Sequence, residues 1–294
     1  MSQELVSVVI PAYNARETIG PTLQSVQNQS YALIETIVVD DGSQDGTAQW
    51  IREHYPFVRV ERVENGGPSQ ARNIGWRLSK GQWVAFLDAD DIWHPRKLEI
   101  QLQAAAVDDR IGLVAADWVR FEPFPDIPLR WTTSTISYYD LLVMNRFQTS
   151  TVVMRREICQ ALGGFDRTVD GAEDWDFWLR ASEMTQICKV DWPLVVYRDR
   201  PQGYSKDLFR VYRTMMPMLD KHRMQKQVTR QQFQTIEAWH HLRFAVGFAL
   251  AKDYAHSGQA LSNVFKRHLA WHAVPAMTQY LLPFLWQRKQ KHSA

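Results

Sequence analysis

The feature that most constrains this chain is a run in which an apolar strand ends in three carboxylates. Residues 83–91 read Trp-Val-Ala-Phe-Leu-Asp-Ala-Asp-Asp. The apolar part suits a strand buried on both faces of a sheet, whereas neighbouring anions repel one another and make a poor purely structural turn. A divalent cation would relieve that repulsion, because carboxylate oxygens are preferred ligands of Mg²⁺ and Mn²⁺. The run therefore indicates a metal site at a strand end, although a solvated acidic turn gives the same pattern.

Strand and helix patterns alternate through the first half of the chain, which predicts an α/β fold with a mostly parallel central sheet flanked by helices. We expect strands at 5–10, 34–39, 58–63 and 83–87, and helices at 15–29, 45–54 and 68–79. In open α/β sheets, ligands bind outside the carboxyl ends of the strands. The pair Asp40 and Asp41 ends one strand, and the group Asp88, Asp90 and Asp91 ends another. Both acidic clusters are therefore expected along one rim of the sheet.

The following segments predict three further strands and two helices. The strands are expected at 112–121, 148–155 and 188–197, and the helices at 156–162 and 173–183. Pro193 interrupts the last strand, which suggests that this strand lies at an edge of the sheet. Beyond residue 205 the pattern becomes helical, so we place a domain boundary there.

Composition and missing motifs exclude several classes of protein. A chain that is 45% hydrophobic and 22% charged is neither disordered nor collagen-like. The cysteines, Cys159 and Cys188, form no CxxC pair and are interpreted as reduced core thiols of a cytoplasmic protein. The N-terminus lacks the pattern of a signal peptide, so export is not expected. No phosphate-binding loop, dinucleotide-binding GxGxxG or GxSxG elbow is present.

The net charge of +2 hides an asymmetry between the two parts of the chain. Residues 206–294 carry 14 Lys and Arg against 4 Asp and Glu. Within them, segments 268–274 and 280–286 and the tail 287–291 combine aromatic and basic residues as interfacial helices do. No apolar stretch reaches the roughly 20 residues that span a bilayer. Two interpretations stay open, namely peripheral contact with an anionic partner such as lipid head groups, or a packed helical cap with a solvated basic face.

Motifs along the chain resemble, in order, the signatures of family 2 glycosyltransferases. They are 7–14 (SVVIPAYN), 38–47 (VVDDGSQDGT), 65–73 (NGGPSQARN), 86–91 (FLDADD), 163–166 (GGFD) and 173–180 (EDWDFWLR). The resemblance implies a GT-A nucleotide-diphospho-sugar transferase fold, a divalent Mn²⁺ or Mg²⁺, and sugar transfer with inversion at the anomeric carbon. Residues 1–205 would form the catalytic domain, with a donor-binding half at about 1–115 and an acceptor-binding half at about 116–205. Residues 206–294 would form a mainly helical appendage.

The resemblance also assigns roles at the nucleotide end of the site. Asp41 would accept a hydrogen bond from the nucleobase of the sugar donor. The segment with Pro11, Tyr13 and Asn14 would border that base, and Asp88 would lie near the ribose.

Two metal ligands and one diphosphate contact follow in the same way. Asp90 would be the principal ligand of the metal, with Asp91 beside it. Arg72 would contact the diphosphate, but an arginine on a helix also commonly pairs with a carboxylate. Many relatives carry a histidine after the base helix, where this chain has Tyr197-Arg198-Asp199-Arg200. Arg198 and Arg200 are therefore further candidates to hold the diphosphate.

Inverting transfer requires a carboxylate that removes the proton from the acceptor hydroxyl on the face opposite the leaving diphosphate. Asp174 matches the family's base position, with Glu173 as a supporting residue. The competing interpretation is that these acids only interact with a helix dipole. Trp175 and Trp178, with Trp131, could stack on an acceptor sugar, although a core position is favoured for Trp178.

These expectations describe a metal-dependent, inverting glycosyltransferase of the hexosyltransferase type. It would move a sugar from a nucleotide-sugar donor to a glycan or lipid-linked saccharide in cell-surface polysaccharide biosynthesis. The expected donor is a UDP-sugar. It would work in the cytoplasm, peripherally at the inner face of the membrane. A catalytically silent sugar-nucleotide-binding subunit is disfavoured by the intact acidic residues, and nucleic-acid binding lacks any recognised motif. Sugar selectivity would depend on residues 118–131 and 148–151, which the motifs do not determine.

Overall fold

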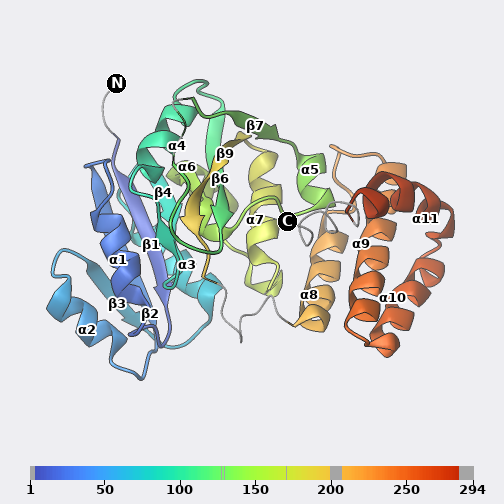
Figure 1. The fold of residues 1–294 in the computed structure, drawn as a ribbon, viewed down its shortest axis with the longest axis horizontal. Coiled ribbons are helices and arrows are strands. Elements are labelled where there is room, and N and C mark those ends of the chain that lie inside the picture. The colour runs from blue at the N-terminus through green and yellow to red at the C-terminus, as the bar shows by residue number, and fades with distance from the viewer. Residues whose placement is uncertain (1–3, 127, 129, 170, 199–206, 285–294) are drawn as a thin grey trace. The chain divides into compact units, whose positions relative to one another are not determined.

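The computed structural model describes residues 4–126, 128, 130–169, 171–198 and 207–284 (Figure 1). The chain forms two compact units, one of Met1–Leu141 with Asn145–Arg200 and one of Leu142–Met144 with Pro201–Ala294. The short stretch Leu142–Met144 therefore groups with the C-terminal residues, which a single boundary near residue 205 does not anticipate.

The first unit begins with four parallel strands, in the order β3-β2-β1-β4. These strands are β1 (Val6–Ala12), β2 (Ile34–Asp41), β3 (Arg59–Val63) and β4 (Trp83–Phe86). Helices α1 (Ile19–Gln27), α2 (Thr47–His54) and α3 (Pro68–Leu78) connect them. Because the strands run the same way, their carboxyl ends share one edge of the sheet, as the sequence predicts.

Side chains on both faces of β1 are buried, which explains its continuous apolar run. On one face, Val8 and Ile10 join the cluster that includes Ile19 of α1 and Ile51 of α2. On the other face, Val9 lies so close to α3 that a Cβ on Gly75 would meet it at 2.2 Å. Helices thus cover the sheet on both sides.

The rest of the sheet is mixed rather than parallel. Its strands are β5 (Ile92–Trp93), β6 (Ile111–Val119), β7 (Thr133–Ile136), β8 (Val153–Arg155) and β9 (Gln186–Val196). Strand β8 pairs antiparallel with both β4 and β6, and β6 pairs parallel with β9. The accompanying helices are α4 (Lys97–Ala105), α5 (Tyr138–Val143), α6 (Arg156–Leu162) and α7 (Glu173–Ser182), with short turns η1 (Thr149–Thr151) and η2 (Arg167–Val169).

Two expectations for this half are wrong. Strand β9 is not an edge strand, because it pairs with β6 on one side and with β5 and β7 on the other. Pro193 is tolerated because it lies opposite Asp117 at shifts in the register of that pairing. The strand expected at 148–155 is in fact the 3₁₀ turn η1 followed by the shorter β8.

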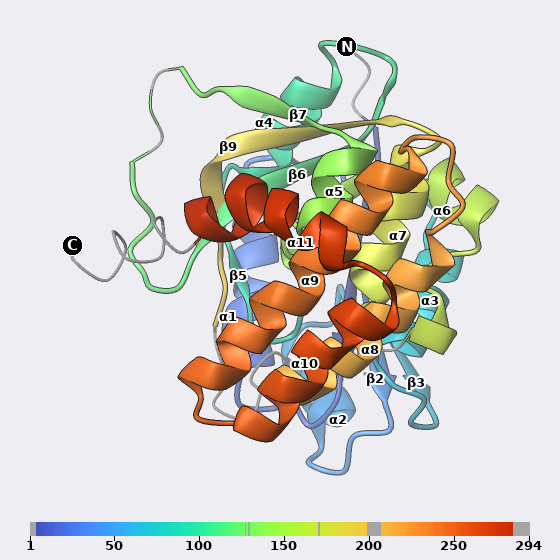
Figure 2. The same cartoon turned by 90° about the vertical axis from the view of Figure 1, so that its right-hand side faces the viewer.

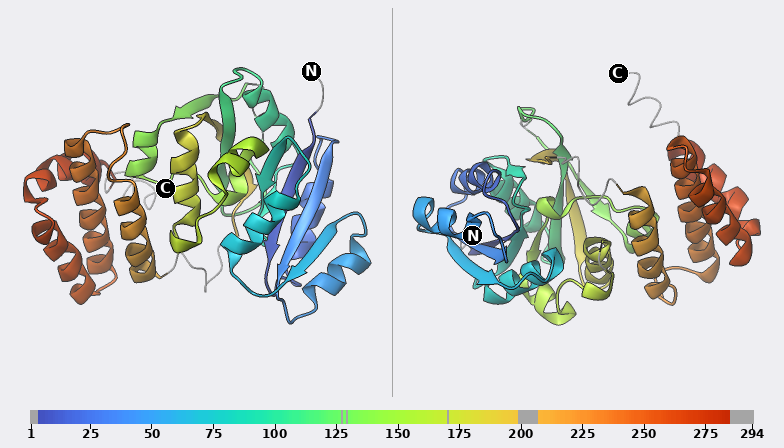
Figure 3. Two further views of the ribbon diagram at one scale, coloured as in Figure 1. Left: turned by 180° about the vertical axis from the view of Figure 1, so that it is seen from behind. Right: turned by 90° about the horizontal axis from the view of Figure 1, so that it is seen from below.

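The second unit consists of packed helices, which Figures 2 and 3 show side by side in orange to red. They are α8 (Leu208–Lys221), α9 (Arg230–Leu250), α10 (Tyr254–Lys266) and α11 (Ala270–Ala276), followed by a π turn at Met277–Leu281. Helix α9 begins at a capping box, in which the Thr229 side chain and Gln232 satisfy each other's backbone amides. Among the described residues, no helix is both long and apolar enough to cross a membrane.

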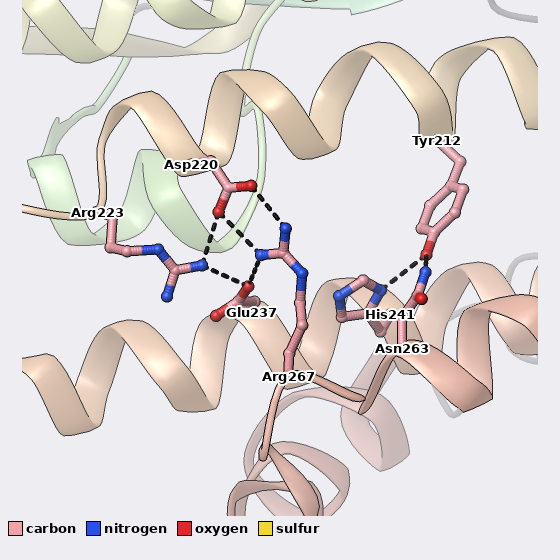
Figure 4. A network of polar contacts seen from close by, with 7 residues as sticks. All are labelled: Tyr212, Asp220, Arg223, Glu237, His241, Asn263 and Arg267. Carbon is pink, nitrogen blue, oxygen red and sulfur yellow. Dashed lines mark hydrogen bonds and ion pairs between the residues drawn. The ribbon is translucent and has the colours of Figure 1, made fainter. Parts of the chain in front are cut away.

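An ionic network around the buried Glu237 links three segments of this unit (Figure 4). Glu237 of α9 is buried and accepts hydrogen bonds from Arg223, at 2.6 Å, and from Arg267. Both arginines also pair with Asp220 of α8. Part of the positive charge counted in residues 206–294 therefore neutralises acids inside the unit rather than facing a partner.

A second polar cluster lies beside that network (Figure 4). The Tyr212 hydroxyl lies 2.8 Å from His241 Nδ1 and accepts a hydrogen bond from Asn263 at 2.9 Å. Burial lowers the pKa of His241 to about 4, so this imidazole is neutral near pH 7. The cluster ties α8, α9 and α10 together through hydrogen bonds, although the buried His241 Nε2 finds no partner among the described residues.

Candidate functional site

The metal-site candidate forms a turn directly after β4. The backbone N–H of Asp91 donates to the carbonyl of Asp88 at 3.1 Å, which closes the turn. Asp88 and Asp90 are half-buried and reach solvent, whereas Asp91 is only 1% exposed. The three carboxylates are therefore not equivalent.

Asp91 is held by protein groups on both carboxylate oxygens. Oδ2 accepts from the Ser150 hydroxyl at 2.5 Å, and Oδ1 accepts from the backbone N–H of Arg198 at 3.0 Å. Burial, together with the nearby charges of Asp88 and Asp90, raises the pKa of Asp91 well above its ordinary range. Asp91 thus ties the turn to η1 and to the end of β9, whereas Asp88 and Asp90 are the two carboxylates of the turn that reach solvent.

At the end of β2, Asp41 organises the neighbouring glycine loop. Its oxygens accept the backbone N–H groups of Gly66 at 2.8 Å and Gly67 at 2.9 Å, and the side chain is buried. Gly67 has a φ of 86°, a conformation that side-chain-bearing residues rarely adopt. The adjacent Asp40 accepts from Ser43 N at 3.0 Å. Asp41 therefore fixes the glycine loop beside the predicted nucleobase site.

The segment predicted to border the nucleobase follows the buried part of β1. Tyr13 is 53% exposed, and Pro11 is half-buried. Asn14 has a φ of 47° and exchanges two hydrogen bonds with the loop after β2, through Ser43 Oγ at 2.9 Å and Gln44 N at 2.8 Å. These bonds bring the ends of β1 and β2 together beside Asp41.

Arg72 of α3 connects the metal turn to the base helix. Its guanidinium donates to Asp88 at 2.7 Å and to Glu173 at 3.3 Å, and it is 6% exposed. These two carboxylates raise its pKa, so it stays charged. Arg72 therefore pairs with carboxylates, which is one of the two roles that the sequence predicts for it. Arg72 Nε is buried and finds no acceptor among the described residues.

Asp174, the predicted base, lies in the first turn of α7. Its Oδ2 is approached by Asn145 Nδ2 at 3.3 Å and Thr149 Oγ1 at 3.4 Å, while Oδ1 accepts its neighbour's backbone N–H. Burial first, and then the adjacent Glu173, raise the pKa of Asp174 to about 6. A carboxylate with this pKa is ionised at pH 7 and basic enough to take up a proton.

The remaining candidates fall into the core or outside the described residues. Trp178 is fully buried, which confirms its expected core position. Trp175 is also buried and donates to the carbonyl of Leu141 at 2.6 Å. Trp131 is partly buried against the main core. Arg198 contributes its backbone to Asp91, and Arg200 lies outside the described residues.

Thr149 and Ser150 lie in the segment 148–151, which the sequence linked to sugar selectivity but not to either acidic centre. They lie in η1, contact Asp174 and Asp91 respectively, and are buried. Three successive hydroxyl residues within a segment expected to form a buried strand are the signal that could have revealed them, because buried hydroxyls require partners.

The carboxylates fit a metal that completes its coordination with substrate. No group of three or more metal-ligating side chains occurs in the part of the chain that the structure describes. Mg²⁺ is commonly held by one or two carboxylates together with substrate phosphates, and Asp88 and Asp90 supply such a pair. The donor set is therefore adequate for a metal bound with a diphosphate.

Comparison with known proteins identifies the family. Residues 7–163 match the family described as Glycosyl transferase family 2. The chain belongs to this family. The resemblance drawn from its motifs is therefore confirmed.

A relative from Escherichia coli and two solved structures support this assignment. The relative is WfgD, named a UDP-Glc:alpha-D-GlcNAc-diphosphoundecaprenol beta-1,3-glucosyltransferase, which is 29% identical over 215 residues, covering 71% of this chain and 83% of WfgD. TarS of S. aureus, solved with UDP-GlcNAc, has a TM-score of 0.66 at 21% identity and covers 88% of this chain and 80% of its own. The mannosyltransferase PcManGT from Pyrobaculum calidifontis, solved with GDP-Man and Mn²⁺, has a TM-score of 0.64 at 21% identity, covering 97% and 81%.

These comparisons show the GT-A fold, and the chain has the C-terminal helices that the sequence predicts. Several curated relatives are matched over only part of their length, for example 61%, 35% and 63%. Donor, acceptor and metal are therefore matters for proposal.

Proposed function

We propose that this glycosyltransferase is metal-dependent and inverting, and that it moves a sugar from a UDP-sugar to a glycan or lipid-linked saccharide. The acceptor oxygen forms a bond to the anomeric carbon on the face opposite the diphosphate. The bond from that carbon to the diphosphate oxygen breaks, and the nucleoside diphosphate leaves with the electron pair. Asp174 takes the proton of the acceptor hydroxyl.

The observation that carries this proposal is the separate setting of the two acidic centres. Asp174 has a raised pKa and only weak, long hydrogen bonds to Oδ2, which suits a group that must accept a proton. Asp88 keeps a short ion pair to Arg72 and a half-buried position, which suits a group that binds cations. Asp174 thus suits proton transfer, and Asp88 suits the binding of a positive charge.

Asp90, with Asp88, would hold the divalent ion, while Asp91 would keep the turn in place. A bound Mn²⁺ or Mg²⁺ would neutralise charge on the diphosphate as the sugar leaves. Arg72 would hold Asp88 and Glu173 at a fixed spacing beside the same diphosphate.

The choice of UDP rests on the relatives rather than on a contact within this chain. WfgD carries UDP-Glc in its name, and TarS was solved with UDP-GlcNAc, whereas PcManGT was solved with GDP-Man. The test is a panel of UDP- and GDP-sugars, each assayed for hydrolysis and transfer with Mn²⁺ and with a chelator. Metal-dependent turnover of a UDP-sugar is expected. Turnover that persists in chelator would contradict the metal requirement.

A peripheral membrane contact through the C-terminal unit is the second part of the proposal. Helices α10 and α11 expose Phe265 and Trp271, which are 69% and 91% exposed, next to Lys266 and His268. Exposed aromatic residues beside cations are typical of surfaces that lie in the headgroup region of anionic membranes. WfgD, whose name specifies a diphosphoundecaprenol acceptor, shows that a relative uses a lipid-linked substrate.

Co-sedimentation with phosphatidylglycerol vesicles tests this contact. The double variant Phe265→Ala/Trp271→Ala should bind severalfold more weakly than the wild type. Phe121→Ala is the matched control, because Phe121 is 80% exposed on the first unit and should not matter. Equal binding of all three proteins would favour the packed helical cap instead.

A further inference from the structure

The turn η1 touches both acidic centres of the proposed site through neighbouring residues. Ser150 Oγ accepts the backbone N–H of Asp88 at 3.0 Å and donates to Asp91 Oδ2 at 2.5 Å. The preceding residue, Thr149, donates to Asp174 Oδ2 at 3.4 Å. The metal turn and the base are therefore joined by two consecutive side chains.

The 3₁₀ geometry of η1 explains how neighbours can serve different elements. A 3₁₀ helix has three residues per turn, so successive side chains point about 120° apart. In an extended strand they would point to opposite faces of the sheet. Only the turn lets Thr149 face α7 while Ser150 faces the segment after β4.

The turn is itself fixed by buried hydrogen bonds. The indole N–H of Trp93 donates to the carbonyl of Ser150 at 2.8 Å. The Gln101 amide donates to the carbonyl of Thr151 at 2.7 Å and to that of Val114 at 2.9 Å. These bonds anchor η1 to the core from α4 and from β5.

We propose that Thr149 and Ser150 are positioning residues that hold the metal-binding turn and the base in one frame. Ser150 sets the turn formed by Asp88 and Asp91, and Thr149 sets the carboxylate of Asp174. This inference rests on the proposed metal-dependent transfer. Together with the Arg72 bridge, η1 gives a second, independent connection between the two centres.

Several charged groups face Asp174 besides the Thr149 hydroxyl. Glu173 on the same helix and Asp88 after β4 raise its pKa, and Arg72 of α3 lowers it. A hydrogen bond to the ionised carboxylate also favours the ionised form. Removing the Thr149 hydroxyl should therefore raise the pKa further and move the acid limb of kcat/KM to higher pH.

Three single hydroxyl deletions along the turn separate the two roles. Ser150→Ala removes the contacts to the metal turn, and Thr149→Val removes the contact to the base. Thr151→Val is the matched control, because its hydroxyl donates to the carbonyl of Gln148 at 2.7 Å within the turn. Each variant is measured by calorimetric titration of UDP at increasing Mn²⁺ and by the pH profile of kcat/KM.

We expect Ser150→Ala to raise the Mn²⁺ concentration for half-maximal UDP binding at least tenfold while leaving the acid limb in place. Thr149→Val should move the acid limb upward by about 0.5 pH unit with an unchanged Mn²⁺ requirement. Thr151→Val should change neither quantity.

An equal shift of both quantities in all three variants would overturn the inference, since it would mean a general loosening of the turn. The inference would also be overturned if Ser150→Ala and Thr149→Val both behaved like Thr151→Val. If Ser150→Ala does not fold, Thr149→Val decides, because it loses a single long hydrogen bond. Wild-type UDP binding that ignores Mn²⁺ would instead refute the proposed metal dependence.

Discussion

Replacing Asp174 with asparagine should abolish transfer and also make the protein more stable near neutral pH. The pKa of Asp174 is about 6 in the folded protein, against an ordinary value of 3.8. The folded state therefore holds the proton more tightly than the unfolded chain. Above pH 6 the wild type must fold with an ionised carboxylate that its surroundings disfavour, whereas asparagine is always neutral.

The size of the effect follows from the shift. A difference of about two pKa units corresponds to about 3 kcal/mol in the free energy of unfolding at pH values above both pKa values. Asparagine keeps an acceptor for its neighbour's backbone N–H. It cannot accept at the position of Oδ2 from both Asn145 and Thr149, and losing those long bonds costs about 1 kcal/mol. The net gain at pH 7.5 is thus about 2 kcal/mol.

The sign also fixes the pH dependence. Below about pH 4 the wild type is protonated in both states, so the advantage of Asp174→Asn disappears. It grows as pH rises from about 4 to about 6 and is constant above that. Urea unfolding of both proteins at pH 4, 5, 6 and 7.5 measures this course.

Asp108→Asn provides a control of opposite sign. Hydrogen bonds from Arg110 lower the pKa of Asp108 to about 2, so its ionised form favours folding and the variant should never be more stable than the wild type. An Asp174→Asn protein that gains nothing at pH 7.5, or gains equally at pH 4, would refute the account of Asp174 as a carboxylate kept in an unfavourable environment for catalysis.

Two further predictions concern stability and the nucleotide site. Glu237→Gln leaves Arg223 and Arg267 without their buried partner and should destabilise the second unit by about 3–5 kcal/mol. Glu99→Gln, which breaks the surface ion pair of the half-buried Glu99 with Arg96, should cost under about 1 kcal/mol in the same urea titration. A Cβ at either Gly67 or Gly258 meets no atom within 4 Å, but only Gly67 has a positive φ. Gly67→Ala should therefore cost about 1–2 kcal/mol and weaken UDP binding, while Gly258→Ala should leave binding unchanged; equal effects of the two would contradict the role given to the glycine loop.

The parts of the fold that the sequence predicts are those with strong local patterns. Strands β1, β2 and β4 contain mainly apolar residues in their buried parts, and helix α6 begins at Arg156 and ends at Leu162 as expected before its glycine. The two acidic clusters lie at one edge of the sheet because they follow parallel strands, whose carboxyl ends share that edge. Local patterning and strand direction are sufficient for these features.

The failures lie where a distant partner decides the structure. Pro193 predicts an edge strand, yet a shift in the register against β6 lets this proline lie inside the sheet. The sequence predicts that Thr149 and Ser150 belong to a strand, but their hydroxyls bind carboxylates on other elements. In the same way, nothing near Asp91 in the sequence indicates that Ser150 and Arg198 occupy its oxygens. Which carboxylates bind metal stays a prediction.

The most direct test of the central claim, that metal binding and proton removal reside on different carboxylates, is a paired measurement on three proteins. UDP binding with and without Mn²⁺ is measured by calorimetry for the wild type, Asp90→Ala and Asp174→Asn, and transfer is assayed on the same preparations. Asp174→Asn should bind UDP and Mn²⁺ like the wild type and lose at least a hundredfold in transfer, whereas Asp90→Ala should lose the metal-dependent part of UDP binding. Wild-type turnover by Asp174→Asn, or unchanged metal-dependent binding by Asp90→Ala, would contradict the account.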